Sequence, residues 1–432
     1  MTGSVEIASV IADEILDSRG NPTLRTTVVL ADGTTGSASV PSGTSTGQFE
    51  AVELRDGDSG RYDGQGVLRA GANVNGPIAQ ALVGLQPDDQ WRIDATLIAV
   101  DGSEYKKRLG SNAILGASLA CAQAAARACE LPLFRYLGGD AAHVLPVPML
   151  NVLNGGCHAD GGPDIQEFMV VPVGAPTFGE AMRYAVETYH ALREVLCEAG
   201  MKANTGDEGG FVPTNATNES AIQMLVCAIE RAGYRPADDI AIALDVSASS
   251  LLENEMYAFA KERVSVSADD MIECIAGWQR RYPIISVEDP IADSDWSGFA
   301  RLTARLGDTM QVVGDDLFVS NRMFLARGIA QRCCNAVLIK PNQVGTVTET
   351  LDTARMALSV GYGAPVSHRS GDTPDTSIAD LAVALNCGQI KAGAPVRGER
   401  VAKYNRLLEI EKWLGAHAEY AGRRAFTHLE SQ

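Results

Sequence analysis

Apolar and polar positions in the first third of the chain form short β-rich runs that give way to helical stretches. Residues 24–30 (LRTTVVL) are rich in β-branched side chains and end at the turn signal Asp32-Gly33. A second strand is expected near residues 35–40. Residues 112–128 (NAILGASLACAQAAARA) are rich in Ala and Leu, so they predict a helix. Strands followed by helices indicate an α+β domain.

The pattern changes around Leu137-Gly138-Gly139 and the prolines Pro146 and Pro148. Beyond this point short apolar runs alternate with helical stretches, which is typical of parallel βα units. We therefore expect an α/β fold with two domains, an α+β domain over residues 1–138 and a βα barrel over residues 139–432.

Six apolar strand candidates of the second region each end in one polar or charged residue. In a parallel βα barrel the carboxyl ends of the strands meet at one mouth, where the active site is built. The side chains after these runs should therefore converge. They are Asp245 after IAIAL, Glu288 after PIISV, Asp315 after QVVG, Lys340 after AVLI, His368 after APVS and Lys391 after GQI.

Three successive strand ends carry the carboxylates Asp245, Glu288 and Asp315. One such acid is more often a solvated loop residue. Three of them brought together would repel, and at least one would bind a proton unless a cation lies between them. Mg²⁺ prefers a few carboxylates with water and substrate oxygens. The pattern therefore predicts a magnesium site.

Lys340 follows the next strand, and a lysine among apolar residues near a metal has a reason to lose its proton at neutral pH. It is a candidate general base, with a structural ion pair as the alternative. Glu167 and Glu208 are placed in polar loops, in DIQEF and GDEGG. Acids held by such loops suit general acid catalysis, although GDEGG alone is also a common turn.

Other polar residues of this region suit the binding of a small anion. His158 lies in a long Gly-rich stretch that could fold over a site. Arg369 and Ser370, beside His368, offer a charged fork and a hydroxyl donor for a phosphate. Lys391 could hold a substrate carboxylate. A base and an acid on opposite faces of such a substrate could remove the proton next to its carboxylate and expel a β-hydroxyl.

Composition narrows the function classes. The 432 residues carry a formal net charge of −18, which argues against a general affinity for nucleic acid. Apolar residues make up 46%, with no run long enough to span a membrane and no recognisable signal peptide at the start. The nine cysteines include no CxxC pair, so we expect reduced thiols and a cytoplasmic location.

Ten segments together resemble the enolase superfamily along nearly the whole chain. A chance match of this number of segments is not credible. They are ILDSRGNPT (15–23), PSGTSTGQFEA (41–51), LNGGCHAD (153–160), DIQEF (164–168), GDEGG (206–210), SVEDP (286–290), GDDL (314–317), KPNQVGT (340–346), SHRSGDT (367–373) and GQIKAGAP (388–395).

The resemblance implies an N-terminal α+β capping domain and a modified (β/α)8 TIM-type barrel with a non-standard start. It implies a homodimer or larger assembly, a small phosphorylated carboxylic acid as substrate, and two Mg²⁺ per active site. Asp245, Glu288 and Asp315 would bind the first Mg²⁺, and Ser45 would help to bind the second. Further implied roles are the base for Lys340, the acid for Glu208 with Glu167 assisting, closure of a loop for His158, and substrate binding for Gln166, His368, Arg369, Ser370 and Lys391.

The implied reaction is conversion of 2-phosphoglycerate to phosphoenolpyruvate and water. Several residues differ from those usual in the family, among them Thr44, Asp372, Pro374 and Gly398. These differences leave open a paralogue that forms carboxyphosphonoenolpyruvate in phosphonate natural-product biosynthesis. A non-catalytic binding protein on the same scaffold is the third reading, and it predicts no turnover of 2-phosphoglycerate.

Overall fold

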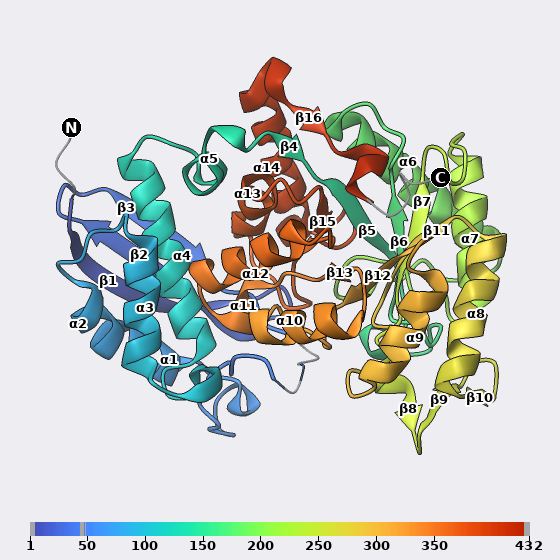
Figure 1. The fold of residues 1–432 in the computed structure, drawn as a ribbon, viewed down its shortest axis with the longest axis horizontal. Coiled ribbons are helices and arrows are strands. Elements are labelled where there is room, and N and C mark those ends of the chain that lie inside the picture. Colours follow the sequence, from blue (N-terminus) through green and yellow to red (C-terminus); the bar gives the residue numbers. More distant parts are fainter. Residues whose placement is uncertain (1–4, 44–46, 48, 427–432) are drawn as a thin grey trace.

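The computed structural model describes residues 5–43, 47 and 49–426. Its N-terminal part, blue to cyan in Figure 1, pairs an antiparallel sheet with helices. The strands are β1 (Ile7–Leu16), β2 (Pro22–Leu30) and β3 (Thr35–Ser39), and the helices are α1 (Leu68–Asn73), α2 (Ala79–Leu82), α3 (Gln90–Asp101), α4 (Ser111–Ala128) and α5 (Leu133–Gly138). The strands predicted at 24–30 and 35–40 and the helix predicted at 112–128 are confirmed, whereas β1 was not foreseen.

Helix α4 packs directly on the N-terminal sheet because small residues let the two backbones approach. Nearly every residue of this helix is buried, in keeping with its Ala-rich sequence. A Cβ atom added to Gly36 of β3 would lie 2.2 Å from the nitrogen of Ala124 and 2.3 Å from the carbonyl oxygen of Ala120. The absence of a side chain at Gly36 therefore sets the spacing between β3 and α4.

The larger part of the molecule is a curled eight-stranded sheet in the order β13-β12-β11-β7-β6-β5-β15-β14. Bridges from Ala336 to Gly363 and from Ile339 to Val366 connect its two edges. The strands are β5 (Val147–Asn154), β6 (Glu167–Val171), β7 (Ala241–Asp245), β11 (Ile284–Glu288), β12 (Gln311–Gly314), β13 (Ala336–Val337), β14 (Val366–Ser367) and β15 (Gln389–Lys391).

One barrel strand runs against its neighbours. β6 pairs antiparallel with both β5 and β7, whereas the other pairs of the large sheet are parallel. The α/β fold with a modified TIM-type barrel and a non-standard start is therefore confirmed.

Two small sheets are separate from the barrel sheet. One consists of β8 (Leu252–Glu253), β9 (Met256–Phe259) and β10 (Val264–Val266), and the other of β4 (Val144–Leu145) and β16 (Glu419–Tyr420).

Helices cover the outer side of the barrel strands (Figure 1). Side chains cap the N-termini of several of these helices. The Thr177 hydroxyl accepts a hydrogen bond from the Glu180 N–H at the start of α6, and Ser267 and Asp270 form a capping box at the start of α8. The helices are α6 (Phe178–Glu198), α7 (Asn218–Arg231), α8 (Ala268–Arg281), α9 (Trp296–Leu306), α10 (Arg322–Gln331), α11 (Pro341–Val344), α12 (Val347–Ser359), α13 (Ser377–Ala384) and α14 (Gly398–Leu414).

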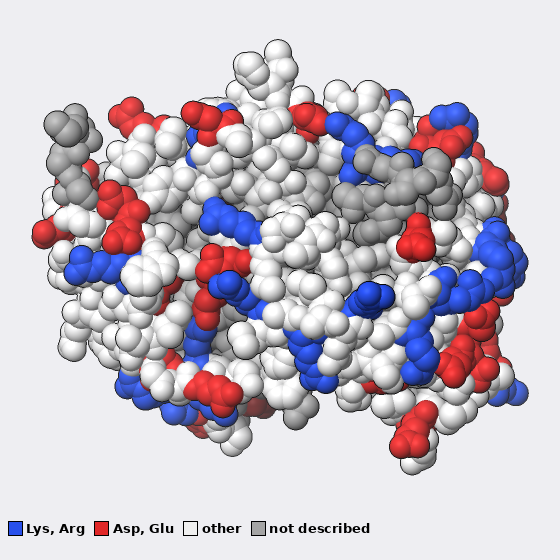
Figure 2. Space-filling view, in the orientation of Figure 1, with Lys and Arg blue, Asp and Glu red and all other residues white. Residues whose placement is uncertain are grey.

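Charged side chains of both signs are interspersed over the face shown in Figure 2. Within the part of the chain that the structure describes, no helix has the length and apolar character needed to cross a bilayer.

Candidate active site

Strand alternation carries the predicted side chains into the barrel interior. Successive residues of a strand point to opposite faces, so Asp245 shares the face of Ala241 and Ala243, which pack in the interior cluster with Met169 and Val171 of β6. Glu167 lies on the same face of β6 by the same rule. Polar residues at these strand ends are therefore directed to the barrel axis rather than to the surrounding helices.

The strand register brings three carboxylates level with one another. Glu167 pairs with Asp245 across β6 and β7, and Asp245 pairs with Glu288 across β7 and β11. Glu167 is thus the first residue of a strand, and its predicted placement in a polar loop is wrong. The loop prediction failed because the strand EFMVV directly follows the polar residues of DIQEF.

A small cavity of about 30 Å³ lies where these strands end. Its wall includes most of the predicted site residues; Glu288 does not line it but contacts Lys391, which does. Ser45 lies outside the described residues. The predicted residues on the wall are His158, Gln166, Glu167, Glu208, Asp245, Asp315, Lys340, His368, Arg369, Ser370 and Lys391.

The Lys391 ammonium lies among the strand-end carboxylates. Its Nζ is 2.8 Å from Asp245 Oδ2, 2.9 Å from Glu288 Oε2 and 3.2 Å from Glu167 Oε2. Burial and the charge of Asp245 raise the pKa of Glu288 well above its ordinary value. Burial alone would lower the pKa of Lys391, but the surrounding carboxylates raise it well above its usual range, so this lysine is cationic.

Three of the acids at the strand ends, which include Asp315 but not Glu167, form a donor set that fits a hard divalent cation. Asp245, Glu288 and Asp315 offer only oxygen atoms, are nearly inaccessible to water, and already attract a compact cationic group. Gln166 adds a buried amide oxygen that has no hydrogen-bond partner among the described residues. Keeping three buried carboxylates ionised side by side costs free energy unless positive charge lies between them.

Lys340 contacts Asp315 directly, and the amide of Gln343 donates to the other oxygen of Asp315 at 2.9 Å. Burial favours the neutral lysine, but the charge of Asp315 raises the pKa of Lys340 above its ordinary value. The ion pair with a nearby acid, which was the alternative for Lys340, is therefore present and favours the ammonium form, and the role of Lys340 as base stays a prediction.

Two further acids, Asp289 and Asp316, adjoin Asp315 and were not predicted. One ligand atom from each of the three lies within 4.8 Å of the others. Asp289 has a φ of 40°, an uncommon conformation for a non-glycine residue, and accepts the backbone N–H groups of Asp315 at 2.9 Å and Asp316 at 2.8 Å. Asp289 thus holds the backbone that positions Asp315. Burial and the charge of Asp315 raise the pKa of Asp316 to about 7.

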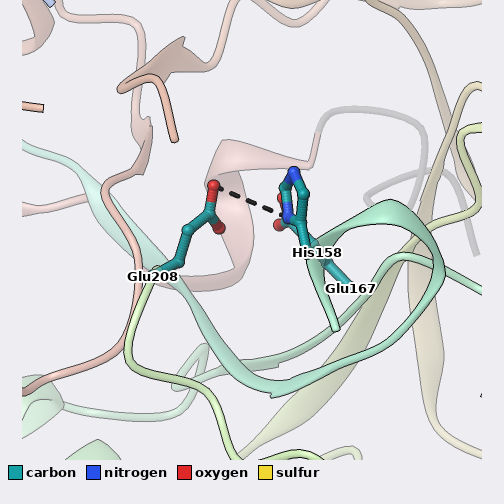
Figure 3. A group of neighbouring side chains, drawn as sticks. All are labelled: His158, Glu167 and Glu208. Atoms are coloured by element: carbon teal, nitrogen blue, oxygen red, sulfur yellow. Dashed lines mark ion pairs between the residues drawn. The ribbon is translucent and has the colours of Figure 1, made fainter. Parts of the chain in front are cut away.

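On another side of the cavity, His158, Glu167 and Glu208 point toward one another (Figure 3). His158 Nδ1 is 3.7 Å from Glu167 Oε1 and 3.8 Å from Glu208 Oε1. Burial and the charge of Glu208 raise the pKa of Glu167 well above its ordinary value. Burial also opposes ionisation of Glu208, but nearby positive groups, which include Arg400 and Lys391, bring its pKa below the ordinary value. Of the two acids, Glu167 is therefore the one whose surroundings favour the protonated form.

The segment after β14 supplies His368, Arg369 and Ser370. His368 Nε2 lies 3.6 Å from Glu208 Oε2, and burial lowers the pKa of His368 well below its usual range. Arg369 Nη1 is 2.9 Å from Glu50 Oε2 and 3.3 Å from Asn342 Oδ1. The Glu50 side chain thus already occupies the Arg369 guanidinium, which the sequence predicts to bind phosphate.

Comparison with known families agrees with this architecture. The family described as "Enolase, N-terminal domain" matches residues 7–137, and the family described as "Enolase, C-terminal TIM barrel domain" matches residues 142–429.

The chain belongs to the enolase family.

It is accordingly an enolase-superfamily lyase, and the enolase family is in general magnesium-dependent. Among the site residues that sequence reasoning missed, Asn151 donates to Glu208 Oε2 at 2.9 Å. Its apolar neighbours in VPMLNVLN, a strand that was not predicted, offered the only signal. Asp289 and Asp316 stand beside predicted acids in EDP and GDDL, so doubled acids at strand ends were the available signal there.

Proposed function

We propose that this enolase-family protein removes the proton next to the carboxylate of 2-phosphoglycerate and eliminates water to give phosphoenolpyruvate. The observation that carries the proposal is that Lys340, the acids Glu167 and Glu208, and the cations Arg369 and Lys391 all line one small buried cavity. These groups are a base, an acid pair and two anion-binding side chains, which is the set that the reaction needs.

Base and acid come from separate parts of the barrel. Lys340 follows β13, and Glu167 is the first residue of β6. In the sheet, the strands β12, β11 and β7 lie between β13 and β6. A substrate in the cavity would therefore meet Lys340 and the acid pair from different sides. Lys340 accepts the α-proton once its contact with Asp315 no longer holds the ammonium form.

Asp245, Glu288 and Asp315 would hold one Mg²⁺ in this proposal. A bound Mg²⁺ would supply positive charge against the negative charge that develops on the substrate carboxylate. Ser45, outside the described residues, is proposed to help hold a second Mg²⁺. Lys391 is proposed to bind the substrate carboxylate, which needs some of its present carboxylate contacts to be given up.

The elimination step needs a protonated Glu208 carboxyl group, because the departing hydroxyl must receive a proton. Glu167, whose raised pKa favours its protonated form, lies close enough to be the source of this proton, because one oxygen of each acid is within 4.8 Å of the other, with His158 beside both. We propose that Glu208 protonates the departing hydroxyl and that Glu167 and His158 supply its proton. Arg369 and Ser370 bind the phosphate, which then takes the place of Glu50 on Arg369.

The direct test is purified protein with Mg²⁺ and 2-phosphoglycerate, with formation of the enol followed by ultraviolet absorbance. We expect ordinary enzyme turnover, about 10 per second. Turnover far below this, combined with activity on a phosphonate analogue, would favour the paralogue that forms carboxyphosphonoenolpyruvate. No turnover of either substrate would favour the non-catalytic reading.

Three other expectations stay predictions. They are the domain division between residues 138 and 139, the cytoplasmic location, and assembly as a homodimer or larger oligomer, which light scattering of the purified protein tests directly.

A further inference from the structure

The barrel helix α14 directs a buried guanidinium into the segment that carries the phosphate-binding residues. Arg400, which is 0% exposed, contacts His368 and the two residues after it. Its Nη1 lies 2.5 Å from His368 Nδ1 and 2.6 Å from the Arg369 carbonyl oxygen, and its Nη2 lies 2.6 Å from the Ser370 carbonyl oxygen. Arg400 is not among the residues that line the cavity, so it acts on the site through other groups.

The chemistry of these contacts determines the tautomer of His368. A guanidinium nitrogen of this kind carries two hydrogens and cannot accept a hydrogen bond. The two short contacts of Nη1, to His368 and to the Arg369 carbonyl, use both hydrogens. His368 Nδ1 must therefore be an acceptor, and the proton of the neutral ring must lie on Nε2. That atom faces Glu208 Oε2 at 3.6 Å.

We propose that Arg400 is a positioning residue that holds His368 in the Nε2–H tautomer and so directs this N–H at Glu208. The proposal rests on the proposed function only for its consequence, namely that Glu208 is the acid of the elimination step. In the other tautomer His368 would present a lone pair to a carboxylate that must carry a proton when it acts. The ring would then compete for that proton instead of orienting the acid.

The same guanidinium also holds the backbone of the phosphate-binding segment, because it accounts for the carbonyl groups of Arg369 and Ser370. A lysine could not replace this fork, since an ammonium is a point charge without a planar array of donors. Gly393 leaves space for the Arg400 side chain, because a Cβ atom at Gly393 would lie 2.9 Å from Arg400 Cδ.

The test combines tautomer and reaction measurements on the full-length protein. Histidine ¹⁵N NMR reports the tautomer without substrate, and the His368→Gln variant assigns the resonance. We expect the wild type to show the Nε2–H form at neutral pH and Arg400→Gln to lose it. Arg400→Lys, which keeps the charge, should restore it only in part. Arg406→Gln is the matched control, since Arg406 lies on the same helix and pairs with Asp380 at 2.7 Å.

In Arg400→Gln we expect elimination to fall on the order of 10²-fold, while exchange of the substrate α-proton with solvent falls much less. Should both steps fall equally, or should Arg400→Gln keep the wild-type tautomer, the proposal is overturned. An Nδ1–H tautomer in the wild type would also overturn it. If the wild type catalyses neither step, the proposed function fails, and the NMR measurement still decides the tautomer assignment. Arg400→Lys serves for every measurement if Arg400→Gln does not fold.

Discussion

Replacing Lys391 by methionine should leave the strand-end carboxylates without their nearest cation. At about 2.9 Å and an effective dielectric constant of about 20, each contact of its Nζ corresponds to about 6 kcal/mol of gross attraction. Transfer of the lysine from water offsets much of this, so we expect a net loss of about 3–5 kcal/mol in the free energy of unfolding, as when one partner of a buried ion pair is removed. The side chain is only 3% exposed, so solvent screening is small.

Mg²⁺ should reduce this loss. With Lys391 absent, Asp245 and Glu288 are fully available to a divalent cation, and a ligand at about 100 times its Kd adds about 2.7 kcal/mol of stability. The assay is urea unfolding in EDTA and in Mg²⁺, at pH 5.5 and pH 8. The deficit in EDTA should also be larger at pH 8, because carboxylates whose folded-state pKa is raised stabilise the fold at low pH and lose that contribution as pH rises.

Lys403→Met is the matched control for this prediction. Lys403 is equally buried and pairs with Asp372 at 2.9 Å, away from the strand-end carboxylates. Its loss should destabilise the protein without any added response to Mg²⁺. Equal stabilisation of the two variants by Mg²⁺, or a Lys391→Met variant as stable as the wild type in EDTA at pH 8, would show that Lys391 does not offset the charge of these carboxylates.

Three further predictions follow from individual contacts. Lys340→Ala should abolish exchange of the α-proton of 2-phosphoglycerate, whereas Glu208→Gln should keep exchange and lose elimination by about 10²–10⁴-fold, both measured by NMR in deuterated water; retained exchange in the first variant would remove Lys340 as base. In EDTA, the stability of the wild type should fall as pH rises through about 7, where Asp316 ionises with a pKa raised by burial and Asp315, and Asp316→Asn should flatten this dependence in urea unfolding. Gly36→Ala should cost about 1–3 kcal/mol by thermal unfolding because its Cβ would meet the backbone of α4. Gly76→Ala should change stability by less than about 0.5 kcal/mol, because within 4 Å its Cβ would meet nothing beyond the neighbouring residues and backbone of its own helix.

The convergence of the site could be predicted from the sequence because it depends on topology. Asp245 and Lys391 end strands that pair in parallel with β11 and β5, and the parallel strands of a closed sheet bring their carboxyl ends to one place. The strands β5 and β6 were missed because VPMLNVLN and EFMVV lie beside glycine-rich and polar segments that resemble loops. Glu167 was assigned to a loop for that reason.

The charge states could not be predicted in the same way, because they depend on distances between side chains. Apolar neighbours in AVLIK suggest a neutral Lys340, whereas the contact with Asp315 and the charge of Glu288 raise its pKa and favour the ammonium form. Arg400 was equally hidden: in the sequence it is one of several charges on an ordinary helix, and its fully buried position against His368 arises from the way α14 packs on the barrel.

Anomalous diffraction from crystals soaked in Mn²⁺, which replaces Mg²⁺ in oxygen-rich sites, tests directly whether the strand-end acids share one cation. We expect an anomalous peak coordinated jointly by Asp245, Glu288 and Asp315, with Lys391 displaced from at least one of them. A peak held by Asp289 and Asp316 instead, or no ordered ion near the strand ends at millimolar Mn²⁺, would contradict this expectation.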